Sequence, residues 1–123
     1  MYKLSVIICT YNRVELLKKC VNSLMIQTTK KENYEIIVID NNSTDNTADI
    51  IRKMTIVNRN LRYVKETNQG LSYARNRGWK EGKGEYIAYI DDDCQADINW
   101  CKHIIEAFEI VKPQPVVIGG SSS

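Results

Sequence analysis

Residues 4–13, LSVIICTYNR, decide the fold of this chain. The stretch begins with an apolar and mostly β-branched run, Leu4–Cys9, which is too short for a helix and suits a strand. Because nearly every position of the run is apolar, it is typical of a strand covered on both faces in a parallel sheet. The run ends abruptly at Thr10–Arg13, which would then lie just beyond the carboxyl end of the strand.

The same strand signal returns four times further along the chain. We expect these strands at Glu35–Ile39, Leu61–Val64, Tyr86–Ile90 and Val116–Ile118. Longer segments with apolar residues at spacings of three and four separate the runs, and this period predicts helices. The alternation predicts a doubly wound α/β fold, with a mostly parallel, Rossmann-like sheet flanked by helices on both faces.

The four expected helices differ in the residues that they turn inward. They are predicted at Val14–Ile26, after the cap-rich cluster Ser43–Asn46, at Leu71–Glu81, and at Ile98–Val111 with Pro113 beyond its end. The inward stripe of the second contains Ala48, Ile51 and Met54. The stripe of the third contains Leu71, Ala74 and Gly78, and its two small residues predict a close approach to the sheet.

Composition indicates one globular domain, residues 1–123, because 43% of the residues are hydrophobic and 26% are charged. The net charge is only +2 and no block of Lys or Arg forms a basic stripe, which argues against nucleic acid as a partner. No apolar run approaches the roughly 20 residues needed to cross a bilayer. The N-terminus lacks a secretory pattern, so we expect a cytoplasmic protein, peripheral to the inner face of the membrane if its full-length form meets one.

The four cysteines and the single histidine do not have the spacing of a zinc site. A disulfide framework is also unneeded in a domain of this size. We expect buried thiols at Cys9 and Cys20 and an exposed His103 without a role. Cys94 and Cys101 fit either environment.

Polar side chains follow four of the expected strands. Strand by strand they are Thr10, Tyr11, Asn12 and Arg13; Asp40, Asn41, Asn42 and Ser43; Glu66–Gly70; and Asp91, Asp92 and Asp93. The carboxyl ends of parallel strands meet at one edge of an open sheet, and ligands bind outside that edge. The sequence therefore predicts a ligand site there.

The sharpest feature of this edge is the run Asp91–Asp93. Adjacent carboxylates repel one another, by about 1–4 kcal/mol for each close pair at 4 Å. A divalent cation removes that repulsion, and oxygen ligands select hard ions such as Mg²⁺ or Mn²⁺. The competing interpretation is a solvated acidic turn that caps the helix from Ile98. The apolar strand before the run favours the metal site.

Three other residues of the edge have two interpretations each. Asp40 either accepts a hydrogen bond from the N–H of a bound base or caps the next helix. Tyr11 either stacks on a flat heterocycle or packs on the domain. Arg75 suits phosphate recognition, or it is a surface arginine on the third helix.

Four stretches of the chain resemble, in order, the signatures of family 2 glycosyltransferases of the GT-A fold. They are Ser5–Arg13 (SVIICTYNR), Asp40–Asp45 (DNNSTD), Asn68–Gly70 (NQG) with Ala74–Gly78 (ARNRG), and Tyr89–Asp93 (YIDDD). One signature alone is weakly specific, but four in order at natural spacing are highly specific. The resemblance covers nearly the whole chain.

The resemblance implies an activated sugar donor, a nucleoside diphosphate sugar and first of all a UDP-sugar. Tyr11 would pack against the base, Asp40 would hydrogen-bond its edge, and Arg75 would lie near the base or the diphosphate. Asp91–Asp93 would correspond to the DxD motif, with Asp91 or Asp92 at the ribose, and with Asp93, aided by Asp91, at a Mg²⁺ or Mn²⁺ ion. The full expected nucleotide-binding set is Thr10, Tyr11, Asn12, Arg13, Asp40, Asn42, Ser43, Arg75, Asp91 and Asp92.

The resemblance also implies an inverting reaction whose general base comes from a C-terminal half. No Asp or Glu follows Glu109. We therefore expect a truncated sheet without the acceptor-binding half, and no sugar transfer by this chain alone. The uncovered sheet edge after Val116–Ile118 predicts self-association.

Two other classes of α/β protein compete with this interpretation. The first is a phosphohydrolase with an aspartate nucleophile at Asp91–Asp93, although no Lys-bearing loop follows as its partner. The second is a non-catalytic nucleotide-binding or receiver-like module, which leaves Tyr11, Asp40 and Arg75 without a shared purpose. A dinucleotide-binding oxidoreductase is less consistent, since the turn after the first strand contains no glycine.

Overall fold

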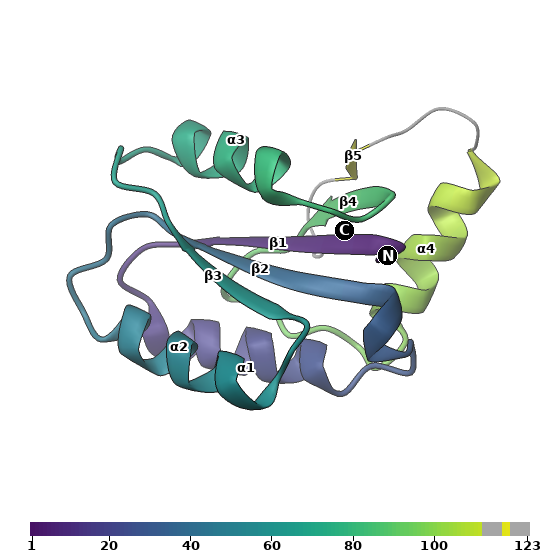
Figure 1. Cartoon of the computed structure of the whole chain (residues 1–123), viewed down its shortest axis with the longest axis horizontal. Coiled ribbons are helices and arrows are strands. Elements are labelled where there is room, and N and C mark those ends of the chain that lie inside the picture. The colour runs from purple at the N-terminus through teal and green to yellow at the C-terminus, as the bar shows by residue number, and fades with distance from the viewer. Residues whose placement is uncertain (112–116, 119–123) are drawn as a thin grey trace.

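The computed structural model describes residues 1–111 and 117–118. A five-stranded parallel sheet in the order β3-β2-β1-β4-β5 forms its centre, with helices on both faces (Figure 1). The strands are β1 (Leu4–Thr10), β2 (Tyr34–Asp40), β3 (Leu61–Lys65), β4 (Tyr86–Tyr89) and β5 (Val117–Ile118). The predicted doubly wound α/β fold is confirmed.

The helices also agree with the sequence pattern. They are α1 (Val14–Met25), α2 (Thr47–Val57), α3 (Leu71–Glu81) and α4 (Trp100–Ile110), with a short 3₁₀ helix, η1 (Lys31–Asn33), before β2. The sequence pattern predicts no helix at η1, because its residues are all polar. In the structure these residues are exposed. Val116, Pro113 and the tail at 119–123 lie outside the described residues. Among the described helices, none is both long and apolar enough to cross a bilayer.

The larger part of the core lies on the face of the sheet that α1, α2 and α4 cover. Alternate residues of each strand point to this face, as the period of two requires. Its buried members include Val6 and Ile8 of β1, Leu17 of α1, Ile51 of α2 and Phe108 of α4. His103, on the outer side of α4, is exposed as predicted.

Of the described helices, α3 alone covers the opposite face of the sheet, over β1 and β2 (Figure 1). Its close approach is confirmed: a Cβ at Gly78 would lie 2.4 Å from the Cγ2 of Ile7, so only glycine fits. Ala74 is buried beside it. The prediction that Leu71 belongs to the inward stripe is wrong, because its side chain is 56% exposed. Leu71 is the first residue of the helix, beyond the edge of the sheet.

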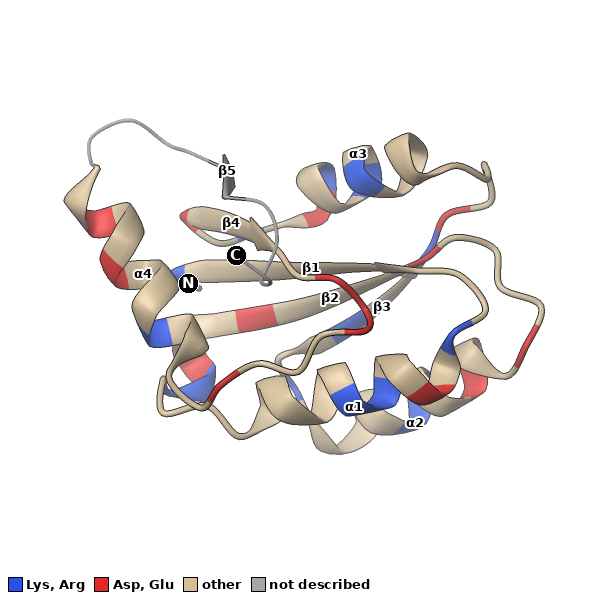
Figure 2. Cartoon of the chain, turned by 180° about the vertical axis from the view of Figure 1, so that it is seen from behind, with Lys and Arg blue, Asp and Glu red and all other residues tan. Residues whose placement is uncertain are grey.

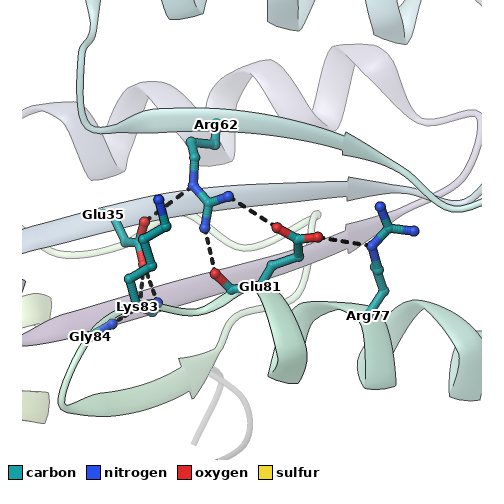
Figure 3. A network of polar contacts seen from close by, with 7 residues as sticks. Glu35, Arg62, Arg77, Glu81, Lys83 and Gly84 are labelled. Atoms are coloured by element: carbon teal, nitrogen blue, oxygen red, sulfur yellow. Dashed lines mark hydrogen bonds and ion pairs between the residues drawn. The ribbon is translucent and has the colours of Figure 1, made fainter.

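A polar network connects β2 to α3 (Figure 3), and it includes Glu35, the first residue of the strand predicted at Glu35–Ile39. Glu35 is 1% exposed and accepts hydrogen bonds from the Ser5 hydroxyl at 2.6 Å and the Lys83 amide at 2.7 Å. Arg62 bridges Glu35, at 3.3 Å, to Glu81, at 3.1 Å. The buried carboxylate therefore has partners on three segments, β1, β3 and the loop after α3, which is what a charge in a core requires.

Candidate functional site

A cleft of about 1180 Å³ opens at the carboxyl edge of the sheet. It lies between the ends of β1 and β4 and the exposed side of α3. The predicted residues that line it are Thr10, Tyr11, Arg13, Arg75, Asp91, Asp92 and Asp93. The structure thus brings together residues that are up to 83 positions apart in the sequence, between Thr10 and Asp93. A cleft of this size has room for a nucleotide-sized ligand.

The three aspartates after β4, on the turn that is red in Figure 2, differ in their surroundings. Asp91 and Asp93 are exposed, whereas Asp92 is 5% exposed and turns toward β1. One Asp92 oxygen accepts a hydrogen bond from the Thr10 hydroxyl at 2.9 Å, and the other pairs with the Arg13 guanidinium at 2.7 Å. The repulsion expected among three adjacent carboxylates is therefore reduced, since the middle charge points away and is neutralised.

The remaining carboxylates of the turn fit a hard divalent cation. One ligand atom each from Asp91, Asp93 and Cys94 lies within 4.8 Å of the others. Two carboxylates suit Mg²⁺ or Mn²⁺, which leave further positions to water and to phosphate oxygens. The Cys94 thiol is a soft donor and contacts Asp93 at 3.7 Å, so it does not complete such a site.

Helix α3 forms the second wall of the cleft. Leu71, Arg75 and Trp79 line it at a spacing of four residues, one turn apart. Among the described residues, Arg75 makes no ion pair, and its backbone carbonyl accepts a hydrogen bond from the Tyr89 hydroxyl at 2.7 Å. Its guanidinium is therefore available to an anion. The sequence analysis missed Trp79, although its position one turn after Arg75 carries that signal.

Asn41 is a second residue of the cleft to which the sequence analysis assigns no role. Its side-chain amide donates to the carbonyls of Glu66, at 3.3 Å, and Asn68, at 2.8 Å, and accepts from the Gly70 amide at 2.9 Å. Gly70 has a φ of +135°, a backbone conformation that favours glycine. Asn41 therefore holds the loop that leads into α3 and so places the start of the helix that carries Arg75.

Three of the predicted nucleotide-binding residues, Asn12, Asn42 and Ser43, do not line the cleft. The Asn12 side-chain oxygen accepts hydrogen bonds from the backbone amides of Thr44, at 2.7 Å, and Asp45, at 3.1 Å. The backbone amide of Asn12 donates to the Ser43 hydroxyl. Asn12 and Asn42 both have a positive φ, which asparagine tolerates better than most residues. These residues join the loops after β1 and β2 beside the cleft.

Asp40 is also outside the cleft lining, and its carboxylate is buried. One oxygen accepts a hydrogen bond from the Ser43 amide at 2.9 Å and the other from the Tyr63 hydroxyl. Burial and this hydrogen bond raise the pKa of Tyr63 well above its usual value. Helix α2 begins further on, at Thr47, whose amide donates to Asp45 rather than to Asp40.

All four thiols are at least partly buried, and burial raises the pKa of three of them. Cys20 and Cys101 are buried, and Cys9, predicted as buried, is half-buried at the cleft. Burial raises the pKa of Cys9 to about 11, against a smaller lowering by Arg75, and burial raises the pKa values of Cys20 and Cys101 to about 12. These thiols remain protonated at neutral pH.

The thiols predict a loss of stability at alkaline pH. The folded-state pKa values are above the unfolded value of 9.0. The contribution of the protonated thiols to the free energy of unfolding is therefore complete below pH 9 and is lost as pH rises toward 11 to 12. For each thiol, the slope of the free energy of unfolding against pH approaches about 1.4 kcal/mol per pH unit in this range. Urea unfolding at pH 8, 9 and 10 should show the fall, and Cys20→Ala should reduce its slope. The matched control is Cys94→Ala; an equal slope in Cys20→Ala and wild type would contradict the prediction.

Comparison with known proteins identifies the class to which this geometry belongs. The family described as glycosyl transferase family 2 matches residues 5–120. Glycosyltransferase AglE of Haloferax volcanii is 40% identical over 97 residues, which is 78% of this chain and 32% of AglE. The poly(ribitol-phosphate) beta-glucosyltransferase of Bacillus spizizenii is 39% identical over 93 residues, 74% of this chain and 15% of that protein. The chain spans about a third or less of the length of these relatives.

Solved structures give the same result. The crystal structure of S. aureus TarS 1-349 in complex with UDP-GlcNAc has a TM-score of 0.79 and 29% identity, over 88% of this chain and 31% of that chain. The mannosyltransferase PcManGT from Pyrobaculum calidifontis, solved with GDP-Man and Mn²⁺, has a TM-score of 0.77 and 24% identity, over 92% and 34%. The second likeness shows the shared fold.

Proposed function

The chain belongs to glycosyltransferase family 2 and has its GT-A fold, and from this premise we propose that it forms the donor site of an enzyme that transfers sugar from a nucleoside diphosphate sugar. One observation carries the proposal. The cleft gathers an exposed aromatic ring, Tyr11, a guanidinium with no ion pair to any described residue, Arg75, and two exposed carboxylates, Asp91 and Asp93. A flat base, a diphosphate and a divalent cation are the ligands that these groups match.

Each group has a distinct part in the proposed donor complex. Tyr11, 47% exposed at the end of β1, packs against the base. Arg75 binds the diphosphate, and Asp91 contacts the ribose or joins Asp93 at the cation. UDP is the first nucleotide to test, because TarS, at 29% identity, was solved with UDP-GlcNAc. The family match favours this function over the phosphohydrolase and receiver-like alternatives.

Asp40 and its neighbours complete the proposed base site. A carboxylate has about four lone-pair sites, and Ser43 and Tyr63 use two of those of Asp40. A base N–H is the expected third partner. Asn12, Asn42 and Ser43 then act by shaping the loops around the base.

The proposed chemistry is departure of the diphosphate from the sugar. A Mg²⁺ or Mn²⁺ ion held by Asp91 and Asp93 would supply Lewis-acid stabilisation of the leaving group. Arg75 adds positive charge to the same oxygens, and Asp92 and Thr10 keep the acidic turn in place. Of the described residues that line the cleft, only the three aspartates carry carboxylates. Three statements about the reaction remain predictions: the general base lies outside residues 1–123, the reaction inverts the anomeric centre, and this chain alone transfers no sugar. A cytoplasmic location and self-association also remain predictions.

Calorimetric titration with UDP, with and without Mn²⁺, tests the donor site. The affinity should rise when Mn²⁺ is present, and Arg75→Gln should weaken UDP binding about tenfold, the loss of one charge-assisted hydrogen bond. Arg59→Gln, at an exposed arginine between α2 and β3, is the matched control and should leave the affinity unchanged. If the folded wild-type chain, checked by circular dichroism, binds none of UDP, GDP and dTDP with Mn²⁺, the proposal is wrong.

A further inference from the structure

We propose that Asp92 and Arg13 are positioning residues, whose ion pair holds the acidic turn so that Asp91 and Asp93 bind the cation and the diphosphate together. This inference rests on the proposed donor site. It assigns to Asp92 and Arg13 a role other than direct contact with the nucleotide. The readout is the coupling between metal binding and nucleotide binding.

The acidic turn, Asp91–Asp93, has little backbone support. The ladder between β1 and β4 ends with the hydrogen bond from the Ile90 amide to the Ile7 carbonyl, at 3.0 Å. Beyond it, the Cys94 amide closes a turn onto the Asp91 carbonyl at 3.1 Å. The proposed metal ligands therefore lie past the last sheet hydrogen bond. Side chains must place them.

Asp92 supplies this placement. It is the residue between the two exposed carboxylates, and it is 5% exposed. Both of its oxygens are engaged, one by Thr10 at the end of β1 and one by Arg13 in the loop before α1. Asp91 and Asp93, on either side of it, are exposed and line the cleft, with ligand atoms within 4.8 Å of each other. The anchor of Asp92 thus orients Asp91 and Asp93.

The charge of Arg13 keeps the Asp92 carboxylate in its inward position. A buried carboxylate without a partner is costly, so Asp92 keeps its inward position only while Arg13 neutralises it. The hydrogen bond and the charge of Asp92 raise the pKa of the Arg13 guanidinium, so Arg13 stays charged. Without Arg13, three like charges would lie side by side on one turn. The middle carboxylate would then turn to solvent or to the cation and disturb the other two.

A third contact supports the same turn from α1. The Cys20 thiol, which is buried, donates to the Asp91 carbonyl at 3.5 Å. Thr10, Arg13 and Cys20 thus hold the acidic turn from β1, the β1–α1 loop and α1. All three lie within eleven residues at the start of the chain, from Thr10 to Cys20. The signature Ser5–Arg13 therefore helps, through Thr10 and Arg13, to place the signature Tyr89–Asp93.

The experiment measures the UDP dissociation constant, with and without Mn²⁺, for wild type, Arg13→Gln, Asp92→Asn and the double variant. The ratio of the two constants is the coupling. In each single variant it should fall about tenfold, with metal-free UDP affinity changed by less than about twofold. The double variant should lose no more than either single variant, because the two residues act as one unit. Arg13→Lys should recover part of the coupling, since one guanidinium nitrogen makes the contact.

Lys3→Gln is the matched control, because it removes one positive charge and two ion pairs from the far end of the sheet. Its coupling should equal that of wild type. Three results would overturn the inference. They are equal loss of UDP affinity with and without Mn²⁺ in Arg13→Gln, loss of coupling in Asp92→Asn only, and a lower melting temperature with coupling retained.

Failure of the donor-site proposal gives a different result. If the folded wild-type chain binds neither UDP nor Mn²⁺, the latter followed by the electron paramagnetic resonance signal of the free ion, the proposed function fails. If wild type shows the coupling and Arg13→Gln keeps it, only the positioning role fails.

Discussion

Asp93→Asn should abolish the Mn²⁺-dependent part of UDP binding, a loss of about 100-fold in affinity when the metal is present. Asparagine has nearly the same shape as aspartate but lacks the charge that a hard cation requires. Asp93 is exposed and faces the cleft, so the substitution leaves the fold intact. Metal-free UDP affinity should be unchanged or slightly higher, since one negative charge near the diphosphate is gone. Calorimetric titration with UDP, with and without Mn²⁺, measures both quantities.

The matched control for Asp93→Asn is Asp49→Asn, which removes an exposed carboxylate from α2. Its UDP affinity should equal that of wild type at every Mn²⁺ concentration. Asp91→Asn should lose the same coupling if Asp91 shares the ion, and only metal-free affinity if it contacts the ribose. Full Mn²⁺ dependence in Asp93→Asn would show that the acidic turn holds no metal.

Glu35→Ala should lower the free energy of unfolding by roughly 3–5 kcal/mol, the range for breaking a buried pair by removing one partner. The substitution removes the acceptor of the Ser5 hydroxyl and the Lys83 amide, and one of the two partners of Arg62. It also leaves a cavity between β2 and α3. Urea denaturation followed by circular dichroism at pH 7 gives the value.

Two variants delimit the cause of that loss. Glu35→Gln keeps the shape and one acceptor oxygen, so its cost should be smaller, about 1–3 kcal/mol. Glu15→Ala breaks the exposed pair with Lys18 on α1 and should change stability by less than about 0.5 kcal/mol. A loss of less than about 1 kcal/mol in Glu35→Ala would mean that desolvation offsets nearly all of the attraction in this network.

The fold was largely predictable because the strands have a simple pattern. β1 and β2 are apolar at nearly every position, and the helices between them have apolar stripes of regular period. The exceptions are residues whose environment depends on a distant segment. Glu35 is buried because Ser5, Lys83 and Arg62 meet there. Leu71 is exposed because α3 begins beyond the edge of the sheet.

The candidate site was predictable in location but only partly in the role of each residue. The predicted residues come from the carboxyl edge of the sheet and, for Arg75, from α3, and seven of them line one cleft. The sequence analysis does not separate groups that face the cleft, such as Asp93, from groups that are engaged by the protein, such as Asp40 and Asp92. Adjacent aspartates look alike in a sequence, since nothing local records which one is buried.

The sequence by itself determined the order of strands and helices along the chain, the glycine at position 78 where α3 approaches the sheet, and the set of polar residues at one edge of the sheet. These follow from period, residue size and chain order, which are local properties. Only the tertiary structure decided that Asp92 pairs with Arg13, that Asn41 holds the loop before α3, and that Asp91 and Asp93 are exposed at the cleft. The physical reason is that a side chain's charge and hydrogen bonds are settled by the groups that meet it in space, and these come from different strands.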